Sequence, residues 1–189
     1  TISILYAFPI IVMILAILLM GEHGSAINWG FAVLGFIGVL MVARPGGGLD
    51  TLGVTFALLS ALLTAIFHLM TRVLSQTETS HALLFHSILV STLCSCLLAL
   101  STWEGSLPSL MDSGLIALLG IILTSAHFLL TVAYRYAPAS LIAPANWGHI
   151  VWAALWGWMF FDHLPDQWTI LGMVVIVAAG VGIAIKTHR

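Results

Sequence analysis

Histidines inside apolar stretches are the residues of this sequence best suited to chemistry. His68, His127 and His149 are each flanked by long runs of apolar residues. A neutral imidazole donates or accepts a hydrogen bond, and near neutral pH it can take up a proton. An ionisable group within a membrane span indicates a functional site, because its burial without a partner is costly. His127 and His149 fall near the middle of their stretches, so we expect them to bind a solute or to carry a proton.

Polar and aromatic residues accompany these histidines at helical spacing. His68 belongs to a polar series with Ser60, Thr64 and Thr71, spaced four, four and three residues apart. His127 belongs to a similar series with Thr124 and Thr131. Each series forms one stripe along a helix. The alternative is that hydroxyl and small residues only hold helices together, at about 0.6 kcal/mol per contact.

A proline precedes the polar residues of the stretch that holds His149. Pro144 removes a backbone donor and can kink a helix, freeing a carbonyl toward a cavity. Pro9 is expected to act in the same way near Tyr6. A tryptophan face next to His149 could stack on a planar or cationic solute. The predicted solute-binding site consists of Tyr6, His68, His127, Asn146, Trp147 and His149.

The composition requires a membrane around these residues. The chain is 61% hydrophobic and 6% charged, with a mean hydropathy of +1.14, whereas soluble domains carry about 25% charged residues. A span of the hydrocarbon core takes about 20 residues. All twelve charged residues lie between or beyond seven apolar stretches, at 1–20, 27–43, 51–71, 81–101, 113–134, 138–161 and 167–185. We therefore predict an all-α polytopic membrane protein with seven transmembrane helices, and we expect no nucleic-acid partner, cofactor or metal.

The end of the sequence repeats its beginning. In each copy an apolar run closes on an acidic residue and a histidine, and a second run carries two glycines and ends on a cation. The corresponding residues are Glu22, Gly30, Gly38 and Arg44 in one copy and Asp162, Gly172, Gly180 and Lys186 in the other. The offset is 140 residues at the acidic pair (162 minus 22) and 142 at the glycines (172 minus 30). The copies begin five spans apart, so they run in opposite directions, as in many transporters. We expect the four glycines to permit close helix approach and rocking.

The repeat also predicts how the chain is organised. With five spans in one unit, residues 1–45 form the last two spans of a first unit, and residues 51–186 form a complete second unit. Thr1 opens inside an apolar stretch, so we expect three preceding spans to be missing from this sequence. Loop cations gather on the cytoplasmic side. Because Arg72, Arg135, Lys186 and Arg189 share one face and Arg44 lies on the other, we predict a cytoplasmic carboxyl terminus.

The motifs resemble the EamA domain of the drug/metabolite transporter superfamily. The resemblance rests on Leu-Met-Gly-Glu at 19–22, Ala-Tyr-Arg-Tyr-Ala-Pro-Ala-Ser at 133–140 and Gly-Trp-Met-Phe-Phe-Asp at 157–162, and it covers all 189 residues. It implies a ten-helix transporter of two inverted five-helix repeats that moves metabolites or xenobiotics across the bacterial inner membrane. The family often closes the first helix of the repeated pair with Gly-Glu. The second copy has Phe161-Asp162, which keeps the charge and loses the glycine that permits close backbone packing.

Three function classes follow from these observations. We favour a transporter that exports or facilitates passage of a small organic solute, embedded in the lipid bilayer. Proton coupling through His127 or His149, a coupling group outside this sequence and no coupling ion all stay open, as does a homodimer. A non-transporting scaffold or oligomerisation subunit is the alternative, in which neighbouring helices fill the polar stripes. We disfavour an enzyme, because the sequence lacks His-Glu-x-x-His, Gly-x-Ser-x-Gly and paired intramembrane carboxylates.

Overall fold

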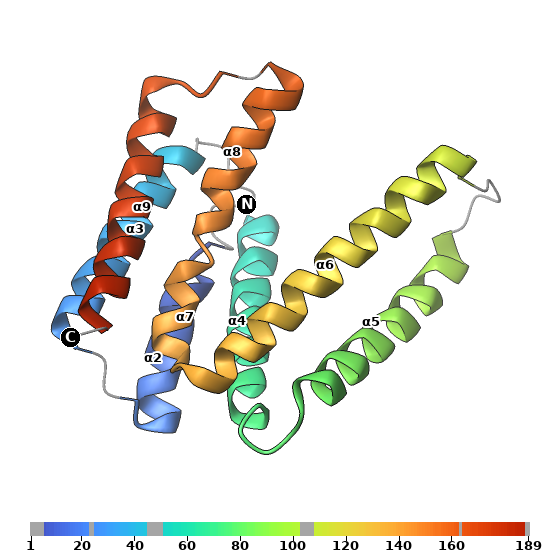
Figure 1. Ribbon diagram of the computed structural model, residues 1–189, viewed down its shortest axis with the longest axis horizontal. Helices are drawn as coiled ribbons and strands as arrows, with labels where there is room; N and C mark the ends of the chain where they lie inside the picture. The colour runs from blue at the N-terminus through green and yellow to red at the C-terminus, as the bar shows by residue number, and fades with distance from the viewer. Residues whose placement is uncertain (1–5, 23–24, 45–50, 103–107, 163, 188–189) are drawn as a thin grey trace. The chain divides into compact units, whose positions relative to one another are not determined.

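The computed structural model describes residues 6–22, 25–44, 51–102, 108–162 and 164–187, and all regular structure within them is helical (Figure 1). The helices are α2 (Phe8–Met20), α3 (Ala26–Ala43), α4 (Thr51–Leu74), α5 (Ser80–Thr102), α6 (Leu110–Tyr136), α7 (Ala139–Ala145), α8 (Gly148–Phe161) and α9 (Gln167–Thr187). The predicted fold class is thereby confirmed.

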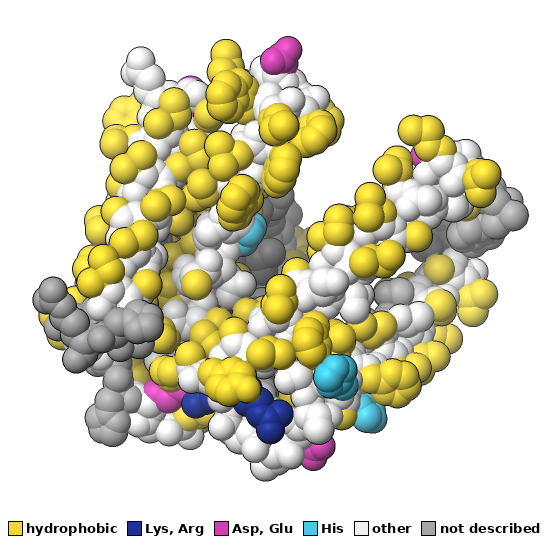
Figure 2. All heavy atoms as spheres, in the orientation of Figure 1, with side chains coloured by type: hydrophobic (Ala, Val, Ile, Leu, Met, Phe, Trp, Pro, Cys, Tyr) yellow, Lys and Arg dark blue, Asp and Glu magenta, His cyan; other side chains and the backbone are white. Residues whose placement is uncertain are grey.

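Within the described residues, five helices are long and apolar enough to cross a membrane: α3, α4, α5, α6 and α9. The first predicted span corresponds to the shorter apolar helix α2. The sixth predicted span, 138–161, is one stretch in the sequence but two helices in the structure, α7 and α8. The side chains along the helices are mostly hydrophobic and charged groups lie near helix ends (Figure 2). Large exposed residues such as Leu18 and Leu100, at 72% and 81% exposed, suit a lipid environment.

The chain forms two compact units. One consists of Thr1–Met70 with Pro138–Arg189, and the other consists of Thr71–Ala137. The first unit therefore joins both ends of the sequence, and it holds α2, α3, α7, α8, α9 and most of α4. The second unit contains the α5–α6 hairpin and the last turn of α4.

Antiparallel packing of α3 against α9 organises the first unit (Figure 1). Gly38 lies against Gly172, Gly35 against Ala179 and Gly182 against the ring of Phe31. Rising numbers in α3 thus meet falling numbers in α9, so the two helices are antiparallel. Between them and α8 lies a core of Val39, Trp147, Ile150 and Ile176.

The four glycines predicted to permit close helix approach divide into two pairs. A Cβ on Gly38 would lie 2.8 Å from the carbonyl oxygen of Gly172, and a Cβ on Gly172 would lie 2.7 Å from that of Gly38. The prediction is confirmed for this pair. It is wrong for Gly30 and Gly180 in this structure, because a Cβ on either would meet nothing within 4 Å.

The two copies end their first helix in the same backbone conformation but with different residues. Gly21 closes α2 with φ at 64°, and Asp162 closes α8 with φ at 54°. A Cβ on Gly21 would meet nothing within 4 Å. The glycine of the Gly-Glu pair therefore allows the left-handed backbone conformation at the helix end and does not serve close packing. In the second copy Asp162 itself adopts that conformation, which aspartate tolerates better than most residues.

In the second unit, a guanidinium closes the carboxyl end of α6. The Arg72 Nη1 donates to the carbonyl oxygen of Tyr134 at 2.6 Å. The last carbonyls of a helix have no partner within the helix, and this contact supplies one. The rings of His81 and Phe128 lie 5.0 Å apart and link α5 to α6.

Candidate functional site

The candidate site is built around the interruption between α7 and α8. Pro144 lies inside α7, and a proline cannot donate the backbone hydrogen bond that continues an α-helix. Beyond it the amide nitrogens of Asn146 and Trp147 donate to carbonyls only three residues back, at 3.1 Å each, and His149 and Ile150 do likewise at 3.2 and 3.0 Å. These bonds tighten the chain into a 3₁₀-like segment. The interruption predicted from Pro144 is therefore present.

Tyr6, Trp147 and His149 come together at this interruption. The indole Nε1 of Trp147 donates to the carbonyl oxygen of Tyr6 at 3.0 Å. The rings of Tyr6 and His149 are 5.3 Å apart between centroids and inclined by 39°. Tyr6 is half-buried and His149 is exposed. Two residues predicted from opposite ends of the sequence thus form one aromatic cluster with the segment that links α7 to α8.

The imidazole of His149 has a defined hydrogen-bonding direction. Its Nδ1 contacts the carbonyl oxygen of Asn146. A carbonyl oxygen only accepts hydrogen bonds, so we assign the proton of the neutral ring to Nδ1, which leaves Nε2 as an acceptor. The side-chain amide of Asn146 turns back to the carbonyl of Ala143, at 3.4 Å.

Trp147 is a core residue in this structure. It is 2% exposed, and its ring lies so close to α3 that a Cβ on Gly35 would come within 2.8 Å of it. The ring of Phe36 lies 6.3 Å from it between centroids. The Trp147 ring faces are therefore covered, and the exposed aromatic surface of the cluster belongs to Tyr6 and His149.

His68 approaches the same amino-terminal segment from α4. It is 7% exposed and stacks on Phe8, with ring centroids 5.1 Å apart and planes inclined by 12°. Phe8 follows Tyr6 by two residues. The other buried residues of α4 are Ala57, Ala61, Ala65 and Leu69, whereas Ser60 of the predicted polar stripe is exposed.

His127 belongs to the second unit. It is half-buried in α6, and the Thr131 hydroxyl donates to its carbonyl oxygen at 2.9 Å. Its membership of the site stays a prediction.

A carboxylate that was not predicted for the site lies at the other end of α7. Glu22 accepts hydrogen bonds from the amide nitrogens of Ala139 and Ser140 at 3.0 and 3.1 Å and from the Ser140 hydroxyl at 2.8 Å. The sequence repeats an acidic residue at this position, but spacing alone does not reveal a partner 117 residues away.

An ion pair joins the carboxyl end of α3 to the start of α9. Arg44 contacts Asp166 through its guanidinium. The Asp166 Oδ1 also accepts from the Thr169 hydroxyl at 2.6 Å and the Thr169 amide at 3.0 Å. These two bonds from Thr169, and after them Arg44, lower the pKa of the Asp166 carboxyl below its ordinary value of 3.8.

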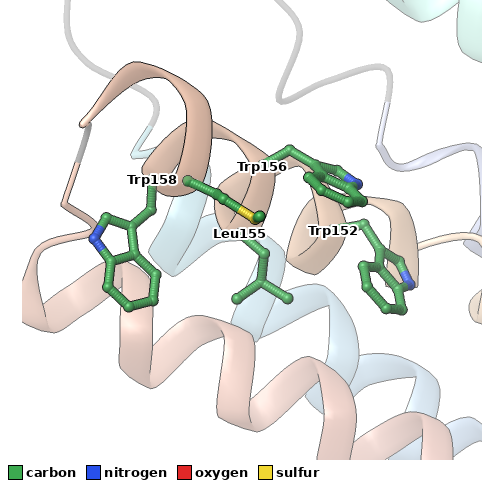
Figure 3. Close-up of a pocket in the computed structure, with 5 residues that line it drawn as sticks. Trp152, Leu155, Trp156 and Trp158 are labelled. Carbon is green, nitrogen blue, oxygen red and sulfur yellow. The ribbon is translucent and has the colours of Figure 1, made fainter.

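The tryptophans that follow His149 line a hollow on α8. Trp152 and Trp156 lie one turn apart on one side, and Trp158 points to the other side (Figure 3). The hollow measures about 440 Å³ and is completed by Leu155 and Met159. Its lining is apolar, so it presents nothing to orient a polar solute. Among the described residues, no group of three or more His, Cys, Asp or Glu could hold a metal ion.

Known proteins with similar sequences are transporters. The chain is 26% identical over 174 residues to the S-adenosylmethionine uptake transporter of Rickettsia prowazekii, covering 92% of the chain and 58% of that protein. It is 29% identical over 178 residues to the pseudopaline exporter CntI of Pseudomonas aeruginosa, covering 93% and 62%. It is 26% identical over 178 residues to a riboflavin transporter of Rhizobium johnstonii, covering 94% and 59%.

Other comparisons set the limits of this similarity. No family model matches the chain, and no solved structure matches it. The match covers 58%, 62% and 59% of the length of the three relatives, so the chain spans about three fifths of each. These relatives include an importer and an exporter and are transporters rather than enzymes. The chain is thus a multi-helix membrane protein with distant homology to bacterial transporters of small molecules.

Proposed function

We propose that this chain is part of an EamA-type drug/metabolite transporter that exports a small organic solute across the bacterial inner membrane by alternating access. The observation that carries the proposal is the interrupted sixth span, where Tyr6, Trp147 and His149 meet. Interrupted spans supply backbone and side-chain groups at the central sites of many transporters. Distant homology to transporters and the antiparallel contact of α3 with α9 support it further. The proposal includes two five-helix repeats and a cytoplasmic carboxyl terminus.

The residues of the site have distinct roles in this proposal. The exposed ring faces of Tyr6 and His149 bind a planar or cationic part of the solute. Trp147 holds the Tyr6 carbonyl through its indole N–H and so fixes the Tyr6 ring relative to His149. Asn146 and His68 orient polar atoms of the solute by hydrogen bonds.

A proton can enter this cycle through His149. With Nδ1–H directed at the Asn146 carbonyl, Nε2 accepts either a solute donor or a proton, and not both at once. Competition between solute and proton for one nitrogen is a simple basis for exchange. We therefore propose proton-coupled export, with facilitated passage as the alternative outcome of the test.

The test is solute flux in proteoliposomes. Protein from the complete gene is reconstituted, and a metabolite panel that includes S-adenosylmethionine and riboflavin is offered with and without an imposed pH gradient. Outward flux of one solute class that responds to the gradient supports the proposal. Gradient-independent flux indicates a facilitator, and inward flux reverses the proposed direction. No flux from folded protein would favour the scaffold function instead.

Histidine variants then test the site. His149→Ala should lower the apparent affinity for solute about two- to tenfold, because one hydrogen bond contributes about 0.5–1.5 kcal/mol. His86→Ala is a matched control, since the His86 Nδ1 makes a comparable local contact, with the Ala82 carbonyl at 2.8 Å, and lies outside the proposed site. Flux and pH dependence that persist in both His127→Ala and His149→Ala would remove these two residues from the site.

A further inference from the structure

Helix α7 has no amino-terminal cap of its own. Its N-cap residue is Pro138, which makes no side-chain capping bond. The first amides of a helix need acceptors from outside the helix. A helix of seven residues is also too short to be stable by itself. The position of α7 therefore depends on groups from elsewhere in the chain.

Glu22 supplies the missing cap from the end of α2. Its Oε1 accepts a hydrogen bond from the amide nitrogen of Ala139. Its Oε2 accepts from both the amide nitrogen and the hydroxyl of Ser140. A carboxylate at a helix amino terminus is favoured by the partial positive charge there. Hydrogen bonds to an ionised group are also shorter and stronger than neutral ones. Glu22 is half-buried, so water competes with these bonds less than at an open surface.

The far end of α7 is fixed to the same amino-terminal part of the chain. Just beyond α7, Trp147 donates to the carbonyl oxygen of Tyr6 at 3.0 Å, and α7 packs against α2. Seven residues of helix extend only about 10 Å. A displacement at Ala139 is thus transmitted through about two turns to Asn146 and about three turns to His149.

We propose that Glu22 is a positioning residue for the solute site: by capping α7, it fixes the register in which the interruption presents Tyr6 and His149 to the solute. The inference rests on the proposed function for its link to solute, and on contacts within the first unit for its geometry. Loss of the cap lets α7 slide or fray along α2. The Tyr6–His149 pair is then no longer held at one separation, and solute binding weakens.

The first test measures the position of α7 without any solute. Spin labels are placed at Leu18 of α2 and Ala145 of α7, both exposed, after Cys94 and Cys96, which are free cysteines, are changed to serine. In the full-length protein, we expect one narrow distance distribution. Glu22→Ala should shift or broaden it, and Glu22→Gln should do so less, because one amide oxygen still accepts. An unchanged distribution in Glu22→Ala overturns the proposal.

The second test measures transport by the same variants. The loss of a hydrogen bond to a charged group typically changes an equilibrium constant about ten- to a hundredfold. We therefore expect Glu22→Ala to raise KM at least tenfold with a smaller change in the maximal rate, and Ser140→Ala to raise KM less. Asp162→Asn is the matched control, because Asp162 is the counterpart of Glu22 in the sequence repeat. Asp162 lies at the end of α8, as Glu22 lies just after the end of α2, but its side chain is exposed. Its KM should equal that of the wild type.

The two measurements separate failure of this inference from failure of the proposed function. A shifted distance with an unchanged KM would overturn the positioning role. If the wild type transports no solute, the proposed function fails and the link to solute fails with it, while the distance still shows whether Glu22 holds α7. If Glu22→Ala does not fold, Glu22→Gln and Ser140→Ala provide the same comparison with milder changes.

Discussion

The close contact of α3 with α9 makes a quantitative prediction about glycine. In Gly172→Ala, the new methyl group would lie 2.7 Å from the carbonyl oxygen of Gly38 and 2.7 Å from Cγ2 of Val42. The Val42 side chain can rotate away, but the Gly38 oxygen is backbone and moves only with α3. In Gly180→Ala, eight residues further along the same helix, the methyl group would meet nothing within 4 Å.

The difference between the two variants isolates the steric cost of the contact. Both variants gain the higher helix propensity of alanine, about 0.8–1 kcal/mol over glycine. Only Gly172→Ala also overpacks, at a typical cost of about 1–3 kcal/mol. We therefore expect Gly172→Ala to be less stable than Gly180→Ala by about 1–3 kcal/mol. At about 2–4 °C per kcal/mol for a protein of this size, the melting temperatures should differ by roughly 2–12 °C.

The assay is thermal unfolding of the two purified variants in the same detergent, each compared with the wild type. Gly180→Ala should melt at or above the wild-type temperature, and Gly172→Ala should melt below it. Equal melting temperatures for the two variants would refute the reasoning, because the steric term would then be absent. A Gly180→Ala variant that is the less stable of the two would show that α3 and α9 cross at the other end.

Two further predictions concern helix ends in the first unit. Gly21→Ala should destabilise the protein by about 1–2 kcal/mol, because L-residues are strained in the left-handed conformation, while Asp162→Gly should raise the melting temperature; a harmless Gly21→Ala would contradict the left-handed backbone there. Asp166 has its pKa lowered first by the two hydrogen bonds from Thr169 and then by Arg44, so its contribution to stability is present above the ordinary carboxyl range and is lost as pH falls through the lowered pKa. Wild type should therefore melt at a higher temperature than Asp166→Asn at about pH 7, and this difference should shrink below about pH 4. A difference independent of pH would exclude the charged interaction.

Much of the fold follows from sequence periodicity and length. Apolar runs of about 20 residues bounded by charge fix where helices begin and end, because neither loops nor charges are tolerated in the hydrocarbon core. Pro144 marks the interruption of the sixth span for a local reason, the missing amide hydrogen. The division of that span into α7 and α8 is not a property of hydropathy, since 138–161 contains no charged residue and is long and apolar enough to be predicted as one span.

The candidate site was only partly predictable, because its remaining determinants are contacts between distant segments. His68 and His149 could be predicted for the site because they are polar residues within apolar stretches. Both lie against aromatic rings of the amino-terminal segment. The role of Trp147 depends on Gly35 leaving room for its ring, and the role of Glu22 depends on an uncapped helix 117 residues away. Neither partner follows a periodic pattern. Pair contacts of this kind require the three-dimensional arrangement.

The interface of α3 with α9 departs from the symmetry that its sequence repeat implies. The 142-residue offset maps Gly38 onto Gly180 and Gly172 onto Gly30, so a two-fold arrangement that repeats the Gly38–Gly172 contact would also bring Gly30 to Gly180. Instead the ring of Phe31 rests on Gly182 near that end. The same offset maps Phe31 onto Met173 and Gly182 onto Leu40, so the two ends carry different side chains at the positions that decide how closely the backbones approach. The repeated glycines would allow the two helices to approach closely at two points. Because an aromatic ring occupies one end of the interface, the backbones approach closely at only one of them. A sequence repeat whose halves are chemically unequal therefore need not pack symmetrically. In the transporter that we propose, this asymmetry is the condition for access to alternate between the two sides of the membrane.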